Sequence, residues 1–359
     1  MHLEWLHVAN VRNIAELELA LYPGVNVFIG PNGAGKTSIL EAAYLLSYAR
    51  SFRAGSNDAL VRRGGEAATV VASVAREGGT TRLGLSRSSR GWEARLNHAA
   101  VPNLATVLRE FVLVCFEPGS HALISGPSQE RRSFLDWGVF HVEPDYLSMA
   151  RRYRRIVQQR NAALKQAASD AEMDVWDVQL AEAAAPLNAK RDAYFTRFSE
   201  DLSQLLALFL PELGLARPIL SIGWPEAMTL LECLGQNRDR DRARGHTSRG
   251  PHRADWSIHF EQAPLREHLS RGQEKLCALA CVLAQARHYA SVKNDWPVIA
   301  LDDLTSELDA AHQQVVVDML TSAGAQVLVT GVEMPEPLRH AEPDRAVFHV
   351  EHGQLRALL

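Results

Sequence analysis

The chain has 359 residues, of which 47% are hydrophobic and 22% are charged, and its formal net charge is −4. This length favours two domains or one domain with a large insertion, and the composition excludes an intrinsically disordered chain. No apolar run approaches 18 residues, and the N-terminal run contains acidic and polar residues. We therefore expect neither a membrane span nor a secretory signal, and we predict a cytoplasmic protein.

The basic residues are almost all arginine. Only five of the 38 Lys and Arg residues are Lys, which leaves 33 Arg. Arginine binds phosphate and carboxylate through a planar fork, but a GC-rich genome explains the same bias equally well. Because the whole chain is slightly acidic, a polyanionic partner would have to bind at a local basic patch.

The cysteines form no CxxC pair, so we predict buried thiols in a reducing compartment rather than a metal–thiolate site. They are Cys115, Cys233, Cys277 and Cys281.

The first 120 residues predict strands around one helix. Short apolar or alternating runs indicate strands before residue 30, and an amphipathic pattern indicates a helix over 35–48. Further strands are predicted over 68–76, 81–87, 92–97 and 111–116.

The following segment, 121–244, is predicted to be mainly helical, since apolar side chains recur every three or four positions. Its last part, the charged run at 238–245, is predicted to be a mobile linker. From residue 255 onwards, strands alternate with helices over 272–290 and 307–322. The chain therefore predicts an α/β fold built from residues 1–120 and 245–359, with a helical arm over 121–244 inserted between the two parts.

Residues 30–37 match the phosphate-binding pattern in which four residues separate a glycine from Gly-Lys-Thr. They follow a predicted strand and open a predicted helix, so backbone N–H groups and the positive helix end would converge on the phosphates of ATP. Lys36 would neutralise phosphate charge, and the Thr37 hydroxyl would bind Mg²⁺. The predicted ATP-binding residues of this loop are Gly30, Pro31, Asn32, Gly33, Ala34, Gly35, Lys36 and Thr37.

Two adjacent carboxylates form a second candidate element of a nucleotide-binding site. Asp302 and Asp303 follow the apolar run 298–301, at the carboxyl end of a predicted strand, where open α/β sheets bind ligands. Asp302 would be the protein carboxylate of the Mg²⁺ site, and Asp303 would orient and deprotonate the attacking water. Together with Lys36, these two are the predicted catalytic residues.

A third element precedes a long apolar helix. It comprises Ser270, Arg271, Gly272 and Gln273. A hydroxyl and free amides at a helix start can bind an anion, although the same residues also fit a simple helix cap. Through this segment the chain resembles the ATP-binding-cassette superfamily, whose signature is LSGGQ, and Ser306 and Asp309 resemble its loop between two nucleotides (the D-loop). The resemblance implies that the signature acts in trans on ATP held by a second subunit, so that ATP joins a head-to-tail dimer.

Longer strings point to one branch of that superfamily. Arg271 replaces a glycine of the transporter signature, and no histidine follows the predicted strand 326–330, where transporters place one; Thr330 and Gly331 stand there instead. Residues 51–53, 126–137, 158–166 and 248–256 resemble the RecF family of bacterial recombination-mediator ATPases, in the same order along the whole chain. Asp303 stands where many cassette ATPases have Glu, which suggests slow hydrolysis. Ala254 replaces an acid that is common in RecF-like sequences, which leaves the role of Asp255 open.

The resemblance implies an ABC-type, SMC-like P-loop ATPase head with an inserted helical arm. It further implies a weak, DNA-stimulated ATPase in which ATP acts mainly as a dimerisation switch. Such a protein binds single-stranded, gapped or junction DNA and helps to load recombinase with RecR and, indirectly, RecO. The cellular roles implied are recombinational repair, replication restart and the SOS response.

Several arginines are candidates for contact with DNA or phosphate. Arg50 and Arg53 follow the predicted phosphate-loop helix, and a cluster in the arm comprises Arg151, Arg152, Arg154, Arg155 and Arg160 around Tyr153. The arm cluster fits DNA contact or a solvated helix face with local ion pairs, because residues 121–244 hold 16 basic and 17 acidic residues. Arg12 is expected near the phosphates, as its counterpart is in SMC-type heads. Arg131 and Arg132 are expected to form ion pairs between arm and head.

Two other function classes remain open from the sequence. A transporter ATPase subunit would couple to a membrane partner and would bind no DNA. An SMC-like chromosome-structure ATPase would carry a long heptad coil, and this sequence has none.

Overall fold

The computed structural model describes residues 1–53, 57–339 and 345–358. The chain forms two compact units, one of Met1–Ser120 with Gln285–Leu359 and one of His121–Ala284. Helix α9 (Arg271–Lys293) begins in the second unit and ends in the first. Among the described residues, no helix has both the length and the apolar character needed to cross a membrane.

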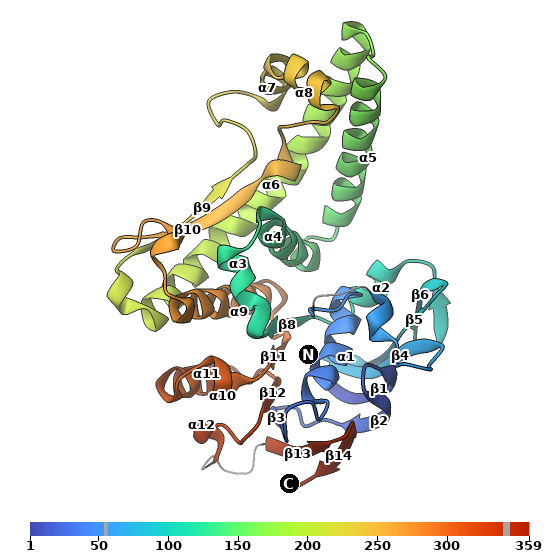
Figure 1. The fold of residues 1–359 in the computed structure, drawn as a ribbon, viewed down its shortest axis with the longest axis vertical. Coiled ribbons are helices and arrows are strands. Elements are labelled where there is room, and N and C mark those ends of the chain that lie inside the picture. The colour runs from blue at the N-terminus through green and yellow to red at the C-terminus, as the bar shows by residue number, and fades with distance from the viewer. Residues whose placement is uncertain (54–56, 340–344, 359) are drawn as a thin grey trace. The chain divides into compact units, whose positions relative to one another are not determined.

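The first unit contains an antiparallel sheet with the strand order β2-β1-β4-β5-β6-β7 (Figure 1). Its period-two patterns bury alternate side chains on one face, as Val70, Ala72 and Val74 show in β4. The strands are β1 (His2–Val11), β2 (Ile14–Ala20), β4 (Ala67–Arg76), β5 (Gly79–Ser88), β6 (Gly91–Leu96) and β7 (Ala99–Val101).

The other sheet of this unit has the order β14-β13-β3-β12-β11-β8, and its neighbours are parallel except for β14. The strands are β3 (Val25–Ile29), β8 (Leu113–Phe116), β11 (Val298–Leu301), β12 (Val327–Gly331), β13 (Arg345–Glu351) and β14 (Gln354–Ala357). All four residues of β11 are buried, as expected for a parallel strand covered on both faces. The carboxyl ends of β3, β11 and β12 therefore lie at one edge of the sheet.

Helix α1 (Lys36–Tyr48) packs against strands of both sheets and joins them into one hydrophobic core. The other helices of this unit are α2 (Leu104–Leu108), α10 (Leu304–Glu307), α11 (Ala310–Ser322) and α12 (Glu336–Arg339), with a 3₁₀ turn over Asn57–Leu60. The helix predicted over 307–322 is present as α11 but begins at Ala310, because the chain is extended at Leu308 and Asp309, and the Asp309 carboxylate caps α11 by accepting from His312 N.

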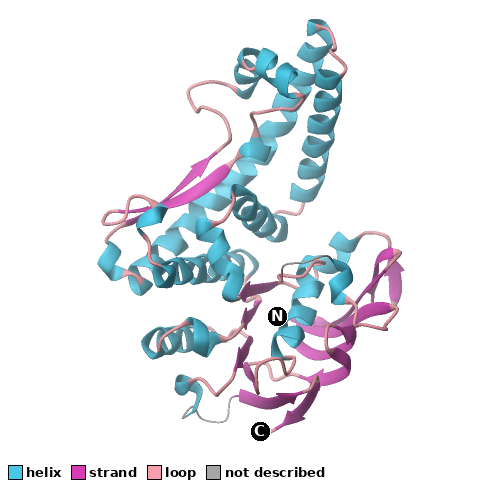
Figure 2. Ribbon diagram, viewed as in Figure 1, coloured by secondary structure: helices cyan, strands magenta, loops and turns pink. Residues whose placement is uncertain are grey.

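The second unit is mainly helical (Figure 2). Its long helices α5 (Tyr146–Lys165) and α6 (Asp170–Phe209) pack against each other, and a Ser169–Glu172 capping box starts α6. The remaining elements are α3 (Ala122–Ser125), α4 (Ser128–Val142), β9 (Ala216–Ser221), α7 (Leu230–Gln236), α8 (Arg238–Arg244) and β10 (Asp255–Phe260). Short 3₁₀ turns of this unit lie at Pro211–Leu213, Pro251–Arg253 and Arg266–His268, and a further one at Pro118–His121 begins in the first unit and ends in the second.

Two sequence predictions for this segment need correction. The predicted mobile linker at 238–245 is helix α8, in which Asp241 is fully buried and Arg238 pairs with Asp174 and Asp177. The predicted arm ends at residue 244, whereas the compact unit continues to Ala284, because β10 pairs with β9 of the arm. The α/β class with a helical insertion is confirmed.

The thiols are free, and Cys233, Cys277 and Cys281 are buried while Cys115 is partly buried. Burial raises the pKa of Cys277 to about 12.

Candidate nucleotide site

The first unit holds a pocket of about 310 Å³ at the carboxyl edge of its parallel sheet. Asn32 to Ser38 form one wall, and Asp302, Asp303 and Thr330 form another. Arg12, Asn13, Arg53 and Pro118 complete the lining. The structure therefore brings together the predicted loop, both predicted carboxylates, Arg12 and Arg53.

The loop between β3 and α1 depends on glycine at two positions. Gly30 has φ 153°, and a Cβ there would lie 2.2 Å from the carbonyl oxygen of Val350. Gly35 has φ 115° and precedes the first turn of α1, for which no side chain in the described part of the chain provides a cap. The N-terminal amides of α1 therefore lie at the pocket without a side-chain acceptor, as in helix ends that bind phosphate.

Lys36 lies beneath this loop. Its ammonium donates to the carbonyl oxygens of Gly30 at 2.8 Å and Pro31 at 3.0 Å, and the residue is 7% exposed. Burial lowers the pKa of Lys36, and the negative charges of Asp303 and Asp302 oppose that shift. The amine is thus folded back on the loop, within reach of whatever anion the loop binds.

Neighbouring segments that sequence analysis did not assign support the loop. Asn13 donates from Nδ2 to Gly33 O at 3.2 Å and accepts from the Ser38 hydroxyl at 3.0 Å. The N–H of Gly353 donates to Ala34 O at 2.8 Å. These hydrogen bonds join the β1–β2 turn, which contains Asn13, and the β13–β14 turn to the phosphate loop. The three segments are far apart in the sequence and come together only in the folded chain.

Asp302 follows β11 and is 3% exposed. Its Oδ1 accepts from the hydroxyl of Thr37 at 2.9 Å and from the hydroxyl of Thr330 at 2.6 Å. Burial raises the pKa of Asp302, and the hydrogen bonds from Thr330 and Thr37 counteract this rise by stabilising the carboxylate. The next residue, Asp303, has a left-handed backbone with φ 55° and precedes α10.

A buried carboxylate, Glu41 of α1, holds both pocket arginines. Arg12 donates to Glu41 from Nε at 3.0 Å and from Nη2 at 2.7 Å, and Arg53 Nη1 lies 3.8 Å from Glu41 Oε2. The Ser51 hydroxyl also donates to Glu41. Arg12 therefore lines the pocket, as expected, but in this structure its guanidinium is paired with Glu41. Arg50 is exposed, and its guanidinium lies 6.0 Å from the centre of the Tyr48 ring.

The predicted signature residues belong to the second unit and form the start of α9. Ser270 N donates to Gln273 Oε1 at 3.0 Å, and Gln273 N donates to Ser270 Oγ at 3.3 Å, which is a reciprocal capping box. Ser270, Arg271 and Gly272 are exposed. In the first unit, Ser306 is exposed in α10, and Asp309 is occupied as the cap of α11.

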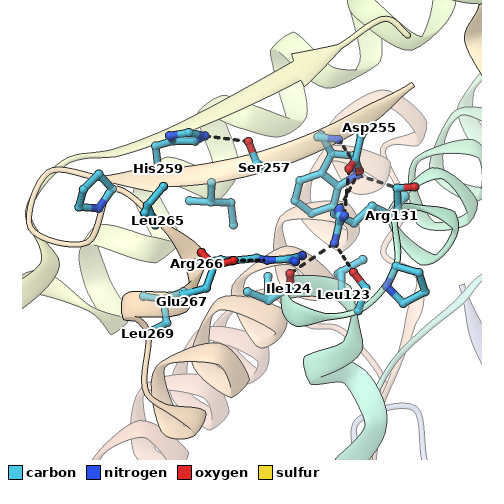
Figure 3. Close-up of a pocket in the computed structure, with 16 residues that line it drawn as sticks. Leu123, Ile124, Arg131, Asp255, Ser257, His259, Leu265, Arg266, Glu267 and Leu269 are labelled. Atoms are coloured by element: carbon cyan, nitrogen blue, oxygen red, sulfur yellow. Dashed lines mark hydrogen bonds and ion pairs between the residues drawn. The ribbon is translucent and has the colours of Figure 1, made fainter. Parts of the chain in front are cut away.

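The second unit has its own pocket of about 500 Å³ (Figure 3). At one end of it Arg131 pairs with Asp255 at 2.7 Å, and Trp256 donates to Arg131 O. Asp255 lies in the part predicted as head, so Arg131 does pair across the two predicted parts, but both residues belong to one compact unit. This pair also gives Asp255 a structural role. Arg132 likewise donates within the unit, to Ala254 O at 2.7 Å.

The arm arginines separate into two groups. Arg151, Arg152, Arg154 and Arg155 are exposed along α5. Arg160 is fully buried and pairs with Asp177 at 2.7 Å and Asp241 at 2.8 Å, so of the two alternatives left open for this cluster, DNA contact is excluded for Arg160 and local ion pairs are present. Tyr153 is also buried, with its hydroxyl 2.7 Å from His252 Nδ1. Burial lowers the pKa of His252 to about 4, so this imidazole is neutral at pH 7 and has a structural role.

Comparison with known proteins places this geometry in a family. The family model for the RecF/RecN/SMC N-terminal domain matches residues 2–355. The DNA replication and repair protein RecF of Stenotrophomonas maltophilia (strain R551-3) is 46% identical over 364 residues, which covers 100% of both chains. The protein of that name from Psychromonas ingrahamii (strain DSM 17664 / CCUG 51855 / 37) is 34% identical, covering 99% of each chain.

Solved structures agree with this assignment. A structure of the recombination mediator protein RecF with ATP in the RecFOR pathway superimposes with a TM-score of 0.89 at 25% identity, covering 100% of this chain and 98% of the other. An Smc head bound to the C-winged helix domain of ScpA superimposes with a TM-score of 0.59 at 16% identity, covering 100% and 97%, and supports the fold alone. This chain belongs to the RecF family.

Proposed function

We propose that this chain is an ATP-dependent DNA-binding protein of DNA replication and recombinational repair. The observation that carries the proposal is the pocket in which the phosphate loop, Thr37, Asp302 and Asp303 lie together. Relatives named DNA replication and repair protein RecF match the chain over its full length, which links that pocket to DNA repair. The solved RecF structure with ATP supports the choice of nucleotide.

In this proposal the loop at 30–37 binds the phosphates of ATP. The amides at the start of α1 donate to phosphate oxygens, and Lys36 exchanges its two carbonyl acceptors for the β- and γ-phosphates. Arg12 and Arg53, held by Glu41 at the pocket wall, add positive charge at the opening.

The donor set of the pocket fits a magnesium ion. Mg²⁺ in nucleotide sites is held by one or two protein oxygens together with phosphates and water, and the Thr37 hydroxyl and the Asp302 carboxylate lie 2.9 Å apart. Mg²⁺ would neutralise charge on the β- and γ-phosphates. The protein's part is to keep Thr37 and Asp302 oriented towards the pocket.

Asp303 is the proposed general base. Its carboxylate lies in the pocket that holds the phosphate loop, beside the metal carboxylate. A water between Asp303 and the γ-phosphate would lose its proton to this carboxylate as it attacks the γ-phosphorus, while the bond from that phosphorus to the β–γ bridging oxygen breaks and ADP leaves. The shorter side chain of Asp, compared with Glu, supports a weak ATPase in which bound ATP acts mainly as a switch.

ATP would also join two copies of the chain. At the start of α9, Ser270, Arg271 and Gly272 are exposed and Gln273 is half-buried, and a second copy's triphosphate would bind at these four residues. Ser306 and Asp309 would meet the partner in the same head-to-tail dimer.

The exposed arginines are the proposed contacts for gapped, single-stranded or junction DNA. Arg50 in the first unit and Arg151, Arg152 and Arg155 on α5 are exposed, which supports binding to phosphates. The RecFOR pathway named for the solved relative supports RecR, and RecO through it, as protein partners.

Sedimentation velocity of the full chain without nucleotide, with ADP and with MgATPγS, each with and without gapped DNA, tests the proposal. We expect a shift from monomer to dimer only with the triphosphate, and co-sedimentation with DNA at low salt. A chain that stays monomeric at high concentration with MgATPγS contradicts the dimer. Absence of DNA binding at low salt contradicts the repair function and favours a membrane-coupled ATPase.

A further inference from the structure

The hydroxyl of Thr330 contacts both Asp302 and Asp303, the two residues that follow β11. It donates to Asp302 Oδ1 at 2.6 Å and accepts from the backbone N–H of Asp303 at 2.8 Å. Thr330 is 1% exposed, yet it lines the nucleotide pocket. One side chain thus binds both the side chain of Asp302 and the main chain of Asp303.

The sheet register explains this placement. β11 and β12 are neighbouring parallel strands (Figure 1). In their register, Leu301 lies opposite Val329. Asp302 and Thr330 are each one residue further along, so they face each other at the same level of adjacent strands. Their side chains reach the same edge of the sheet, beside the phosphate loop.

The hydrogen bonds of Thr330 restrict the rotation of the Asp302 carboxylate and the backbone conformation of Asp303. The first matters for a bound metal and the second for the attacking water. Thr37 and Thr330 both donate to Oδ1 of Asp302, while Oδ2 has no protein donor among the described residues. The carboxylate is thereby held with Oδ2 free for a cation or its water. At Asp303, the backbone N–H donates to the Thr330 hydroxyl, which helps to hold the left-handed backbone with φ 55°. This backbone conformation sets the direction of the Asp303 side chain.

We propose that Thr330 is a positioning residue that orients Asp302 for the metal and Asp303 for the attacking water. The inference rests on the proposed function, since it presumes that these two residues serve a metal–nucleotide complex. It adds a residue from a different strand, β12, to the site.

Three proteins test this inference: the unaltered chain, Thr330→Val and Thr330→Ser. Valine keeps the shape and strand preference of threonine but has no hydroxyl, whereas serine keeps the hydroxyl. Electron paramagnetic resonance would measure the affinity of Mn²⁺ for each protein in the presence of ATPγS. Fluorescence of a labelled ATP in EDTA would measure nucleotide binding without metal.

We expect Thr330→Val to weaken Mn²⁺ binding by about 10- to 100-fold, as the loss of outer-shell partners does at other metal sites. Nucleotide binding in EDTA should change by less than about threefold, because Thr330 donates to no phosphate-loop atom, and Thr330→Ser should keep most of the Mn²⁺ affinity. A purely structural role for Thr330 would instead lower both affinities together.

The outcomes separate the inference from the proposed function. Unchanged Mn²⁺ affinity in Thr330→Val, or equal losses in Thr330→Val and Thr330→Ser, overturns the role of the hydroxyl while the nucleotide site stands. Failure of the unaltered chain to bind Mn²⁺ with ATPγS overturns the nucleotide site itself, and the inference with it. Should Thr330→Val not fold, as judged by its thermal melting, Thr330→Ala provides a second hydroxyl-free protein for the same titration.

Discussion

Lys36 is the residue whose charge the nucleotide site depends on most. Its ammonium lies against two loop carbonyls, and no other lysine lines the described pocket. Lys36→Ala removes a charged donor to phosphate, so we expect ATP affinity to fall by about 10- to 100-fold, together with loss of the ATP-induced dimer. Titration calorimetry with ATPγS measures the affinity. Lys165→Ala, at an exposed residue of α5, is the matched control and should bind as the unaltered chain does.

Asp303 allows a clean separation of binding from hydrolysis. Asparagine tolerates the left-handed backbone of this position, so Asp303→Asn should fold normally while losing the proposed base. We expect the hydrolysis rate to fall by about 10²- to 10⁴-fold, with ATP binding nearly unchanged and ATP-bound dimers accumulating. Phosphate release and sedimentation measure the two quantities. Hydrolysis at the original rate would remove Asp303 from the mechanism.

At the scale of elements, the arm depends on an ionic network between α5, α6 and α8. Arg160 of α5 is fully buried between Asp177 of α6 and Asp241 of α8, and it donates to Thr247 at 3.0 Å. Arg160→Leu leaves two buried carboxylates with one partner fewer, which costs about 3–5 kcal/mol. We expect hydrogen exchange to accelerate across these three helices. Arg154→Ala, on the exposed face of α5, should change stability by less than about 0.5 kcal/mol.

The exposed arginines of α5 are predicted to bind DNA. Replacing Arg151, Arg152 and Arg155 by Ala should weaken DNA binding and lower the slope of log K against log salt by about one unit for each phosphate that is no longer neutralised. Fluorescence anisotropy with gapped DNA at several salt concentrations measures the slope. A matched triple variant replaces other exposed arginines of the same unit, namely Arg197, Arg217 and Arg240. An equal loss in both variants would indicate a general charge effect and not a site on α5.

At the scale of the whole molecule, the proposed dimer separates two functions of the chain. The phosphate loop belongs to the first unit, and the signature belongs to the second. Ser270→Ala should therefore leave ATP binding by the monomer nearly unchanged, while preventing the dimer that MgATPγS induces in the unaltered chain. The side chain of Ser270 caps α9, so its removal should also cost about 1 kcal/mol of stability.

Comparison of Ser270→Ala with Lys36→Ala decides whether the signature acts in trans. Sedimentation and titration calorimetry of both variants, run side by side, measure dimer formation and nucleotide affinity. Equal losses of nucleotide affinity would contradict the trans arrangement, because they would place Ser270 at the same nucleotide as Lys36.

The parts of the nucleotide site that lie in short continuous stretches of sequence were predictable from the sequence. A strand, a glycine loop and a helix occupy residues 25–48, and their local order is enough to aim amides at a phosphate. Asp302 and Asp303 follow a continuous apolar run, which indicates a buried parallel strand with its carboxylates at the ligand edge. The α/β class and the helical insertion follow from the same periodicities.

Only the tertiary structure decided which side chains from distant parts of the sequence contact the residues of the nucleotide site. Thr330 reaches Asp302 because β12 lies beside β11 in one register, and Glu41 meets Arg12 because α1 packs near β1. The charged run at 238–245 resembles a solvated linker until Asp174 and Asp177 of α6 are placed beside it. Short stretches of sequence determine the local backbone conformation. Strand register and helix packing bring together residues that are far apart in the chain, and such contacts cannot be predicted from a short-range pattern.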